Sequence, residues 1–224
     1  MMDFSFTPQQ EAWRQEVKKF LKENPTEKFP VEGVDEGYGC GASSDKFGRL
    51  LGSKGWISMT WPKQYGGQER PMMDVLILLE EMAYARAPWF GVLFNFTTGN
   101  MLIRIGSDEL KKELLPGVAR GEECFWLAMS EPDAGSDLLG MRTHAIEKED
   151  HWVVNGQKTW ASLADLARLG LLYTKTETDP NIPKSKTITM FLLDKNLPGI
   201  TVRPLINLAG DITHNEVFLD EVRI

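Results

Sequence analysis

Apolar residues recur at helical spacing through the first half of the chain. The run from Thr7 to Gln10 combines a capping threonine, a proline at the first helical position and a glutamine three residues after the cap, which predicts a helix start. Trp13, Val17 and Phe20 then fall on one face of that helix. Pro116 is expected to end or interrupt the last helix of this half. Similar patterns predict further helices over 45–51, from 71, over 95–105 and from 107.

The second half carries short apolar runs separated by turn signals. Asn155-Gly156 is a favoured two-residue hairpin turn, and alternation after it would place Lys158, Trp160 and Ser162 on one side of a strand. Because helices come first and strands afterwards, the pattern predicts an α+β protein, with an all-α domain followed by a β domain. The expected strands cover 125–129, 152–154, 157–160, 169–175, 187–193, 199–203 and 217–224.

Composition and charge narrow the classes of function. The chain has 224 residues, 42% hydrophobic and 25% charged, which is typical of a folded globular protein. A net charge of −7 argues against a nucleic-acid partner, and no apolar run reaches the roughly 18 residues of a membrane span. Residues 1–4 lack the features of a signal peptide, so we expect a cytoplasmic protein. The three histidines and two cysteines share no metal-ligand spacing, and no metal site is predicted.

One segment has the composition of a ligand-binding loop. The run from Ser130 to Asp137 follows an apolar strand directly and combines hydroxyls, carboxylates and small residues. Small side chains at Ala134, Gly135 and Ser136 allow a ligand to approach the backbone, and amide groups beside hydroxyls suit an oxygen-rich ligand such as a flavin or a phosphate. The alternative is a hairpin loop that has no ligand.

A second segment, Asn155 to Ser162, carries an aromatic residue beside a hydroxyl. On one strand face, Trp160 could stack on a planar ring while Ser162 donates a hydrogen bond to it. The alternative is a tryptophan that belongs to the core, next to a serine with a partner inside the protein.

Taken together, residues 127–137 and 155–162 resemble the acyl-CoA dehydrogenase family, which has an EPxAGSD-type loop and an NGxKxW-type strand in this order. Residues 61–67, 80–83 and 215–224 also match the family, so the resemblance covers essentially the whole chain. It implies an N-terminal helical domain over 1–122 and a β-barrel-like middle domain over 123–224. The family's C-terminal helical domain is expected to be absent from these residues.

The resemblance also implies an FAD site. Met129, Ser130, Gly135 and Ser136 match the loop that lines the flavin, and Ser136 also matches a position beside the acyl-CoA. Trp160 matches the residue that packs on the isoalloxazine, and Ser162 matches the hydroxyl near its reactive nitrogen. The cofactor-binding residues implied in this way are Leu127, Met129, Ser130, Gly135, Ser136, Trp160, Ala161 and Ser162.

The implied reaction is the α,β-dehydrogenation of an acyl-CoA thioester to a 2,3-enoyl-CoA. A carboxylate base removes the α-proton while the β-hydrogen leaves as hydride to the flavin. The resemblance implies that the base lies in the C-terminal domain. Glu131 is a candidate because it lies in the loop, but it is better explained as a carboxylate that orders this loop. The implied partners are an electron-transfer flavoprotein and the missing half or a second subunit, in a homo- or hetero-oligomer. The alternatives are an acyl-CoA oxidase or flavin monooxygenase on the same scaffold, or a non-catalytic partner subunit.

Overall fold

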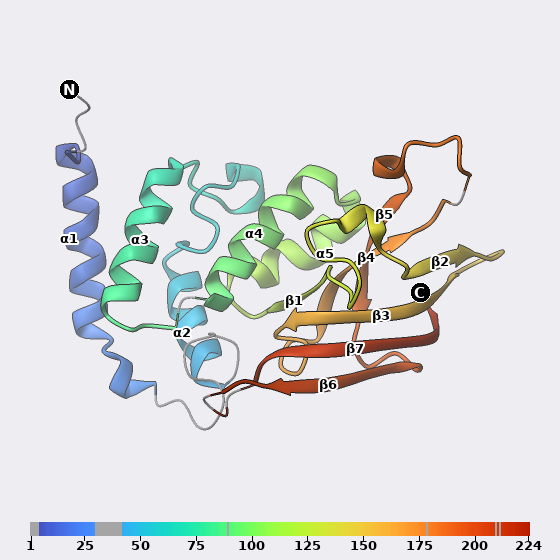
Figure 1. Cartoon of the computed structure of the whole chain (residues 1–224). Coiled ribbons are helices and arrows are strands. Elements are labelled where there is room, and N and C mark those ends of the chain that lie inside the picture. The colour runs from blue at the N-terminus through green and yellow to red at the C-terminus, as the bar shows by residue number, and fades with distance from the viewer. Residues whose placement is uncertain (1–4, 30–41, 89, 178, 209, 211) are drawn as a thin grey trace. The chain divides into compact units, whose positions relative to one another are not determined.

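The computed structural model describes residues 5–29, 42–88, 90–177, 179–208, 210 and 212–224. The chain divides into two compact units, Met1–Glu123 and Cys124–Ile224. The first unit is helical and the second is built on one sheet (Figure 1). The helices precede the strands along the chain, so the α+β fold class predicted from the sequence pattern is confirmed.

The first unit contains five α-helices and two short 3₁₀ turns among its described residues. The capping box predicted at the first helix is present, because Thr7 Oγ1 accepts from the Gln10 amide at 3.2 Å and Gln10 Oε1 accepts from the Thr7 amide at 2.8 Å. The bounds are α1 Pro8–Glu23, η1 Thr26–Lys28, α2 Ala42–Ser53, η2 Lys63–Tyr65, α3 Met72–Tyr84, α4 Phe90–Ile105 and α5 Asp108–Ala119.

Aromatic side chains organise the core of the helical unit. Trp13 and Phe20, on the predicted apolar face of α1, each pack against Trp56 with ring centroids 4.8 Å apart. The Trp13 indole also donates a hydrogen bond to the Asp74 carbonyl at 2.8 Å, which ties α1 to α3. The two helices therefore run side by side within this unit (Figure 1).

The prediction that Pro116 ends or interrupts its helix is wrong. Helix α5 continues to Ala119 with Pro116 inside it, and the Arg120 amide donates to the Pro116 carbonyl at 3.2 Å. A proline removes only one helical hydrogen bond, because it lacks the amide that would reach the carbonyl four residues earlier. Burial of Leu114, Leu115 and Val118 holds the last turns in place.

The second unit is a curled mixed sheet with strand order β1-β4-β2-β3-β7-β6. Strand β1 lies parallel to β4, and β5 pairs antiparallel with the same strand. Strands β3, β7 and β6 form a long antiparallel ribbon (Figure 1). The bounds are β1 Phe125–Ala128, β2 His144–Glu147, β3 Trp152–Ser162, β4 Leu169–Lys175, β5 Ile188–Asp194, β6 Ile200–Ile206 and β7 Ile212–Arg223; η3 Leu138–Gly140 and η4 Lys184–Lys186 are 3₁₀ turns.

The predicted hairpin turn at Asn155-Gly156 is also wrong, because both residues lie inside β3. The turn between β2 and β3 falls instead at Lys148 to His151, where the Lys148 amide donates to the His151 carbonyl at 2.8 Å. Gly156 serves a close approach between strands: a Cβ on it would lie 2.4 Å from Thr143 Oγ1. The glycine of this dipeptide is therefore required by close strand packing and not by a turn.

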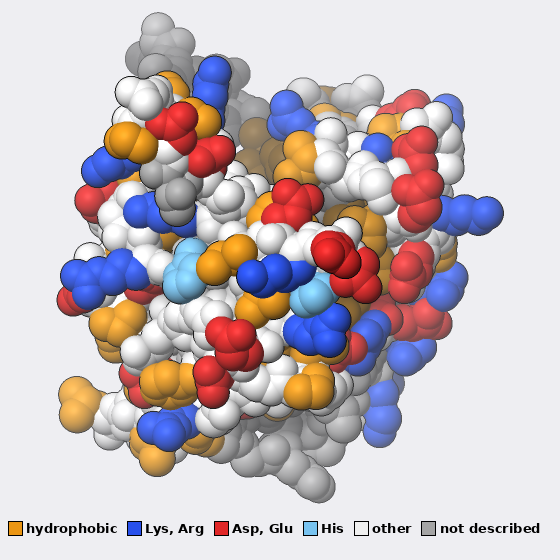
Figure 2. Space-filling model, turned by 90° about the vertical axis from the view of Figure 1, so that its right-hand side faces the viewer, with side chains coloured by type: hydrophobic (Ala, Val, Ile, Leu, Met, Phe, Trp, Pro, Cys, Tyr) orange, Lys and Arg blue, Asp and Glu red, His pale blue; other side chains and the backbone are white. Residues whose placement is uncertain are grey.

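Charged side chains of both signs are mixed on the face of the molecule drawn in Figure 2. Of the helices that the structure describes, none combines the length and apolar character needed to cross a bilayer.

Candidate functional site

The two segments singled out in the sequence lie against each other in the second unit. The Thr159 amide donates to the Ser130 carbonyl at 2.9 Å, and Lys158 Nζ donates to the Met129 carbonyl at 3.2 Å. These bonds connect the loop that follows β1 to the middle of β3, although the residues are 29 positions apart. The loop and the strand therefore form one local structure, which we call the loop–strand junction (residues 129–136 and 158–162).

A buried ion pair fixes the base of this junction. Lys158 is completely buried, Glu131 is 7% exposed, and Nζ lies 2.9 Å from Glu131 Oε1. The same carboxylate accepts from the backbone amides of Arg142 at 2.6 Å and Thr143 at 2.9 Å. Glu131 therefore orders the loop through hydrogen bonds to Lys158 and to two backbone amides.

Hydrogen bonding keeps this carboxylate ionised. Burial alone would raise the pKa of Glu131, but the hydrogen bonds from Thr143, Arg142 and Lys158 outweigh burial and hold that pKa below its ordinary value of 4.5. Burial lowers the pKa of Lys158, and the attraction of Glu131 opposes that effect. An ionised carboxylate that accepts three hydrogen bonds is poorly suited to remove a proton from a substrate.

The tip of the loop is a tight turn. Glu131 and Ala134 exchange two backbone hydrogen bonds of 2.8 and 3.1 Å, with Pro132-Asp133 between them. Gly135 and Ser136 follow on the exposed side, and a Cβ on Gly135 would meet nothing within 4 Å. The turn thus presents open backbone directly after its anchored base.

Several polar groups of the junction, on exposed or half-buried residues, have no hydrogen-bond partner among the described residues. Within the described ranges, no acceptor meets the amides of Gly135 and Ser136, and no partner meets the hydroxyls of Ser130, Ser136 and Ser162. Groups that are left unpaired on a protein surface bind water or a ligand. The junction can therefore offer several donors and acceptors to a polar ligand edge.

Trp160 projects from the same strand in an unusual backbone conformation. Its φ is +58°, and the pairing of β3 with β7 shifts register between Lys158 and Ala161, which marks a β-bulge. The side chain is 62% exposed, whereas Lys158 is fully buried, so the prediction that these two share a side of the strand is wrong. The bulge breaks the simple alternation and turns the indole outward.

An apolar cavity of about 730 Å³ lies beside the indole. It is lined by Trp160, by His214 at 5.9 Å between ring centroids, by Thr213, and by residues 205–208 at the end of β6. Ile206 is 71% exposed, so this surface offers an apolar contact area around the tryptophan. A planar aromatic ligand could stack there.

The remaining predicted residues have less direct positions. Ala161 is fully buried, so its side chain packs inside the sheet unit. Its carbonyl accepts a hydrogen bond from Asn215 Nδ2 at 3.2 Å. Leu127 is half-buried in β1 and pairs with Leu171 of β4. No sequence motif pointed to His214, because it comes next to Trp160 only through the pairing of β3 with β7.

The architecture is a helical unit followed by a curled mixed sheet, with a loop pinned to the strand that carries an exposed tryptophan. Family models describe both parts: "Acyl-CoA dehydrogenase, N-terminal domain" matches residues 7–122, and "Acyl-CoA dehydrogenase, middle domain" matches residues 126–222. Together they cover nearly the whole chain. The chain belongs to the acyl-CoA dehydrogenase family.

Relatives of known name agree with this assignment. The acyl-CoA dehydrogenase FadE26 of Mycobacterium tuberculosis (strain ATCC 25618 / H37Rv) is 34% identical over 226 residues, which cover 100% of this chain and 56% of that protein. The mitochondrial isovaleryl-CoA dehydrogenase of Pongo abelii is 32% identical over 205 residues, which cover 90% of this chain and 47% of that protein. The chain thus spans about half the length of these relatives.

Solved structures share the fold. The structure described as "Tcur3481-Tcur3483 steroid ACAD" has a TM-score of 0.86 and 30% identity, covering 100% of this chain and 57% of that one. The "ChsE4-ChsE5 complex from Mycobacterium tuberculosis" has a TM-score of 0.83 and 32% identity, covering 100% and 56%. A glutaryl-coenzyme A dehydrogenase in complex with glutaryl-CoA has a TM-score of 0.82 and 27% identity, covering 100% and 56%.

Proposed function

We propose that this chain supplies the flavin- and acyl-CoA-facing half of an FAD-dependent acyl-CoA dehydrogenase, which oxidises an acyl-CoA thioester to its 2,3-enoyl-CoA. Residues 1–122 would act as the N-terminal helical domain and residues 123–224 as the middle domain. The observation that carries the proposal is the loop–strand junction, where hydroxyls and amides that have no partner among the described residues lie on a base anchored by an ion pair, within a chain of this family.

The residues present fit an isoalloxazine ring. Trp160 offers an exposed indole beside an apolar cavity, which suits the flat face of the ring. Ser130, Ser136 and Ser162 offer hydroxyls for its polar edge, and Gly135 leaves room for close approach. Leu127, Met129 and Ala161 would support these groups through the backbone around them. When bound, FAD supplies the acceptor for the β-hydrogen of the substrate.

The protein's own contribution to this reaction is positioning. Trp160 would hold the ring, Ser162 would donate a hydrogen bond near its reactive edge, and Ser136 would contact the acyl-CoA. We assign the catalytic base to a part of the enzyme outside residues 1–224, because Glu131 is fully engaged by Lys158 and two backbone amides. An electron-transfer flavoprotein would then reoxidise the flavin, as the family resemblance suggests.

The relatives also suggest a substrate class and an assembly. One similar structure is described as a ChsE4-ChsE5 complex, and another is described as the Tcur3481-Tcur3483 steroid ACAD. We therefore propose that the intact enzyme works as a hetero-oligomer on the CoA thioester of a bulky polycyclic acid. The second subunit would complete the site.

The test is FAD binding by the intact protein, followed by visible difference spectroscopy. We expect a perturbed flavin spectrum, and Trp160→Ala should weaken FAD binding by about tenfold or more, which is about 1.4 kcal/mol. The free energy of unfolding of the Trp160→Ala variant should differ from that of the wild type by about 0.5 kcal/mol or less, because the indole is exposed. Tyr84→Ala in the other unit is the control, because Tyr84 is also an exposed aromatic residue, at 77% against 62% for Trp160.

Two results would defeat the proposal. One is an intact protein that ignores FAD, with or without its second subunit. The other is equal FAD affinity in the wild type and Trp160→Ala. If the reduced holoprotein reacts quickly with oxygen, the assignment moves from a dehydrogenase to an oxidase on the same scaffold.

A further inference from the structure

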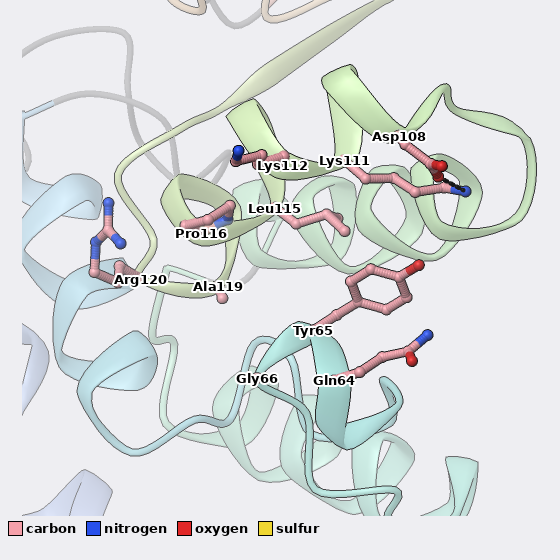
Figure 3. Close-up of a pocket in the computed structure, with 10 residues that line it drawn as sticks. All are labelled: Gln64, Tyr65, Gly66, Asp108, Lys111, Lys112, Leu115, Pro116, Ala119 and Arg120. Atoms are coloured by element: carbon pink, nitrogen blue, oxygen red, sulfur yellow. Dashed lines mark ion pairs between the residues drawn. The ribbon is translucent and has the colours of Figure 1, made fainter.

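A pocket of about 620 Å³ lies within the helical unit, between the 3₁₀ turn η2 and helix α5 (Figure 3). Its volume falls in the range of small-molecule binding sites, roughly 300–1,000 Å³. All of its lining residues belong to the unit Met1–Glu123. The pocket is therefore a property of one compact unit.

The floor of the pocket is apolar. Leu115, Pro116 and Ala119 come from α5, and the ring of Tyr65 faces them from η2. In Figure 3, the Leu115 side chain and the Tyr65 ring lie on opposite sides of the opening. Gly66 follows Tyr65 in the left-handed region with φ of +78°, and a Cβ on it would meet no atom within 4 Å. The space beside the ring is open to an apolar ligand.

The rim of the pocket is cationic. Lys111, Lys112 and Arg120 line it, and Asp108 is the one acidic residue among its described lining residues. This balance runs against the composition of the chain, which has 32 acidic and 25 basic residues. A cluster of cations around an apolar floor favours a ligand that has both an apolar body and a negative charge.

The ion pairs at the rim leave positive charge available to bind such a ligand. Lys112 has no acidic partner in the described part of the chain. Lys111 pairs with Asp108 at 3.6 Å, but that carboxylate is 95% exposed, and exposed pairs contribute little. Arg120 is held more firmly by Glu122 at 2.6 Å. Lys112 is therefore the cation best able to take an anionic head group, and Lys111 could assist.

We propose that this pocket binds an amphiphilic anion, with an extended apolar body between Tyr65 and Leu115 and one anionic head at Lys112. Free carboxylates and organic phosphates with an alkyl or aryl body share this chemistry. The proposal goes beyond the dehydrogenase function and does not depend on it.

The test uses isothermal titration calorimetry on the intact, FAD-treated protein with four probes: decanoate, decyl phosphate, decan-1-ol and acetate. We expect at least one of the two amphiphilic anions to bind at least tenfold more tightly than either decan-1-ol or acetate. The better of the two identifies the preferred head group. Equal binding of decan-1-ol would remove the role of charge, and equal binding of acetate would remove the role of the apolar floor; either result overturns the proposal.

Two variants locate the binding. Ala119→Phe fills the pocket, and Lys112→Glu reverses the charge at its rim; each should reduce binding of the better anion by at least tenfold. Lys46→Glu, an exposed lysine of α2 outside the pocket, should leave it unchanged. If Ala119→Phe fails to fold by circular dichroism, Lys112→Glu decides alone. Unchanged affinity in Lys112→Glu, or an equal loss in Lys46→Glu, contradicts the assignment.

Discussion

At the scale of single residues, the pair Glu131–Lys158 explains how a loop of small polar residues can be rigid. The charged groups are almost completely removed from water, and their distance is 2.9 Å. Removing two charges from water is costly, so such a pair is stable only when further hydrogen bonds satisfy both groups. Here the Glu131 carboxylate also accepts hydrogen bonds from two backbone amides, and the Lys158 ammonium also donates one to the Met129 carbonyl.

Removing one partner of this pair should be strongly destabilising. We expect Lys158→Met to lower the free energy of unfolding of the sheet unit by roughly 3–5 kcal/mol, because it leaves a buried carboxylate without its cation. Lys148→Met, an exposed lysine in the β2–β3 turn, should change it by about 0.5 kcal/mol or less. Urea unfolding followed by tryptophan fluorescence measures both. Similar stabilities for the two variants would show that the pair does not hold the loop.

The stability of the junction should also depend on pH. The folded-state pKa of Glu131 is below its ordinary value of 4.5, so its contribution is complete well above pH 4.5 and disappears as the pH falls through the lower, folded value. Glu131→Gln cannot titrate. The difference in unfolding free energy between wild type and Glu131→Gln should therefore be largest at neutral pH and shrink below pH 4.5. A difference that stays constant across this range would contradict the lowered pKa.

At the scale of elements, β3 shows how packing changes the meaning of a sequence motif. Gly156 lies in the strand and faces Thr143 of the preceding segment, with no room for a Cβ. Further along, the register shift between Lys158 and Ala161 directs Lys158 inward and Trp160 outward. One strand therefore carries both the buried anchor and the exposed ring of the junction.

Two glycine substitutions compare a crowded position with an open one. Gly156→Ala should destabilise the sheet unit by roughly 1–3 kcal/mol, because its Cβ would overlap the Thr143 side chain. Gly135→Ala, where a Cβ meets nothing within 4 Å, should leave folding nearly unchanged. Thermal unfolding of the two variants gives the comparison. If Gly156→Ala is tolerated as well as Gly135→Ala, the close approach is not a constraint on this strand.

At the scale of the whole molecule, ligand binding and folding are linked. A ligand that binds only the folded protein stabilises it by about 2.7 kcal/mol when its concentration is one hundred times its Kd. The same linkage applies to FAD, if it binds as proposed. The loop–strand junction is the part of this chain where we expect the effect of FAD.

Hydrogen exchange of the intact protein can locate this effect. FAD should slow exchange at the amides of Gly135 and Ser136, which have no acceptor among the described residues. ADP, which lacks the isoalloxazine, should slow these amides much less. Amides within α1 are an internal control, because they are already hydrogen bonded in a helix. Protection by ADP equal to that by FAD would place the flavin ring elsewhere.

Much of the fold could be predicted from local signals. The capping box at Thr7 appears as predicted, and the strand predicted over 169–175 matches β4. The helix predicted from 107 is α5, which has Ser107 as its N-cap. Strand β2 was not predicted, because only Ala145 of its four residues is buried and the run shows no apolar pattern. The hairpin at Asn155-Gly156 failed because an intrinsic turn preference is weak compared with strand pairing on both sides.

The amino-acid sequence by itself determined the order of helices and strands and the two segments that form the junction, because capping, periodicity and motif spacing act over a few residues. Tertiary structure alone decided that Lys158 is buried against Glu131, that Trp160 is turned outward, and that His214 lies beside it. Those outcomes depend on strand register and on desolvation. Both arise only when residues far apart in the chain are packed together.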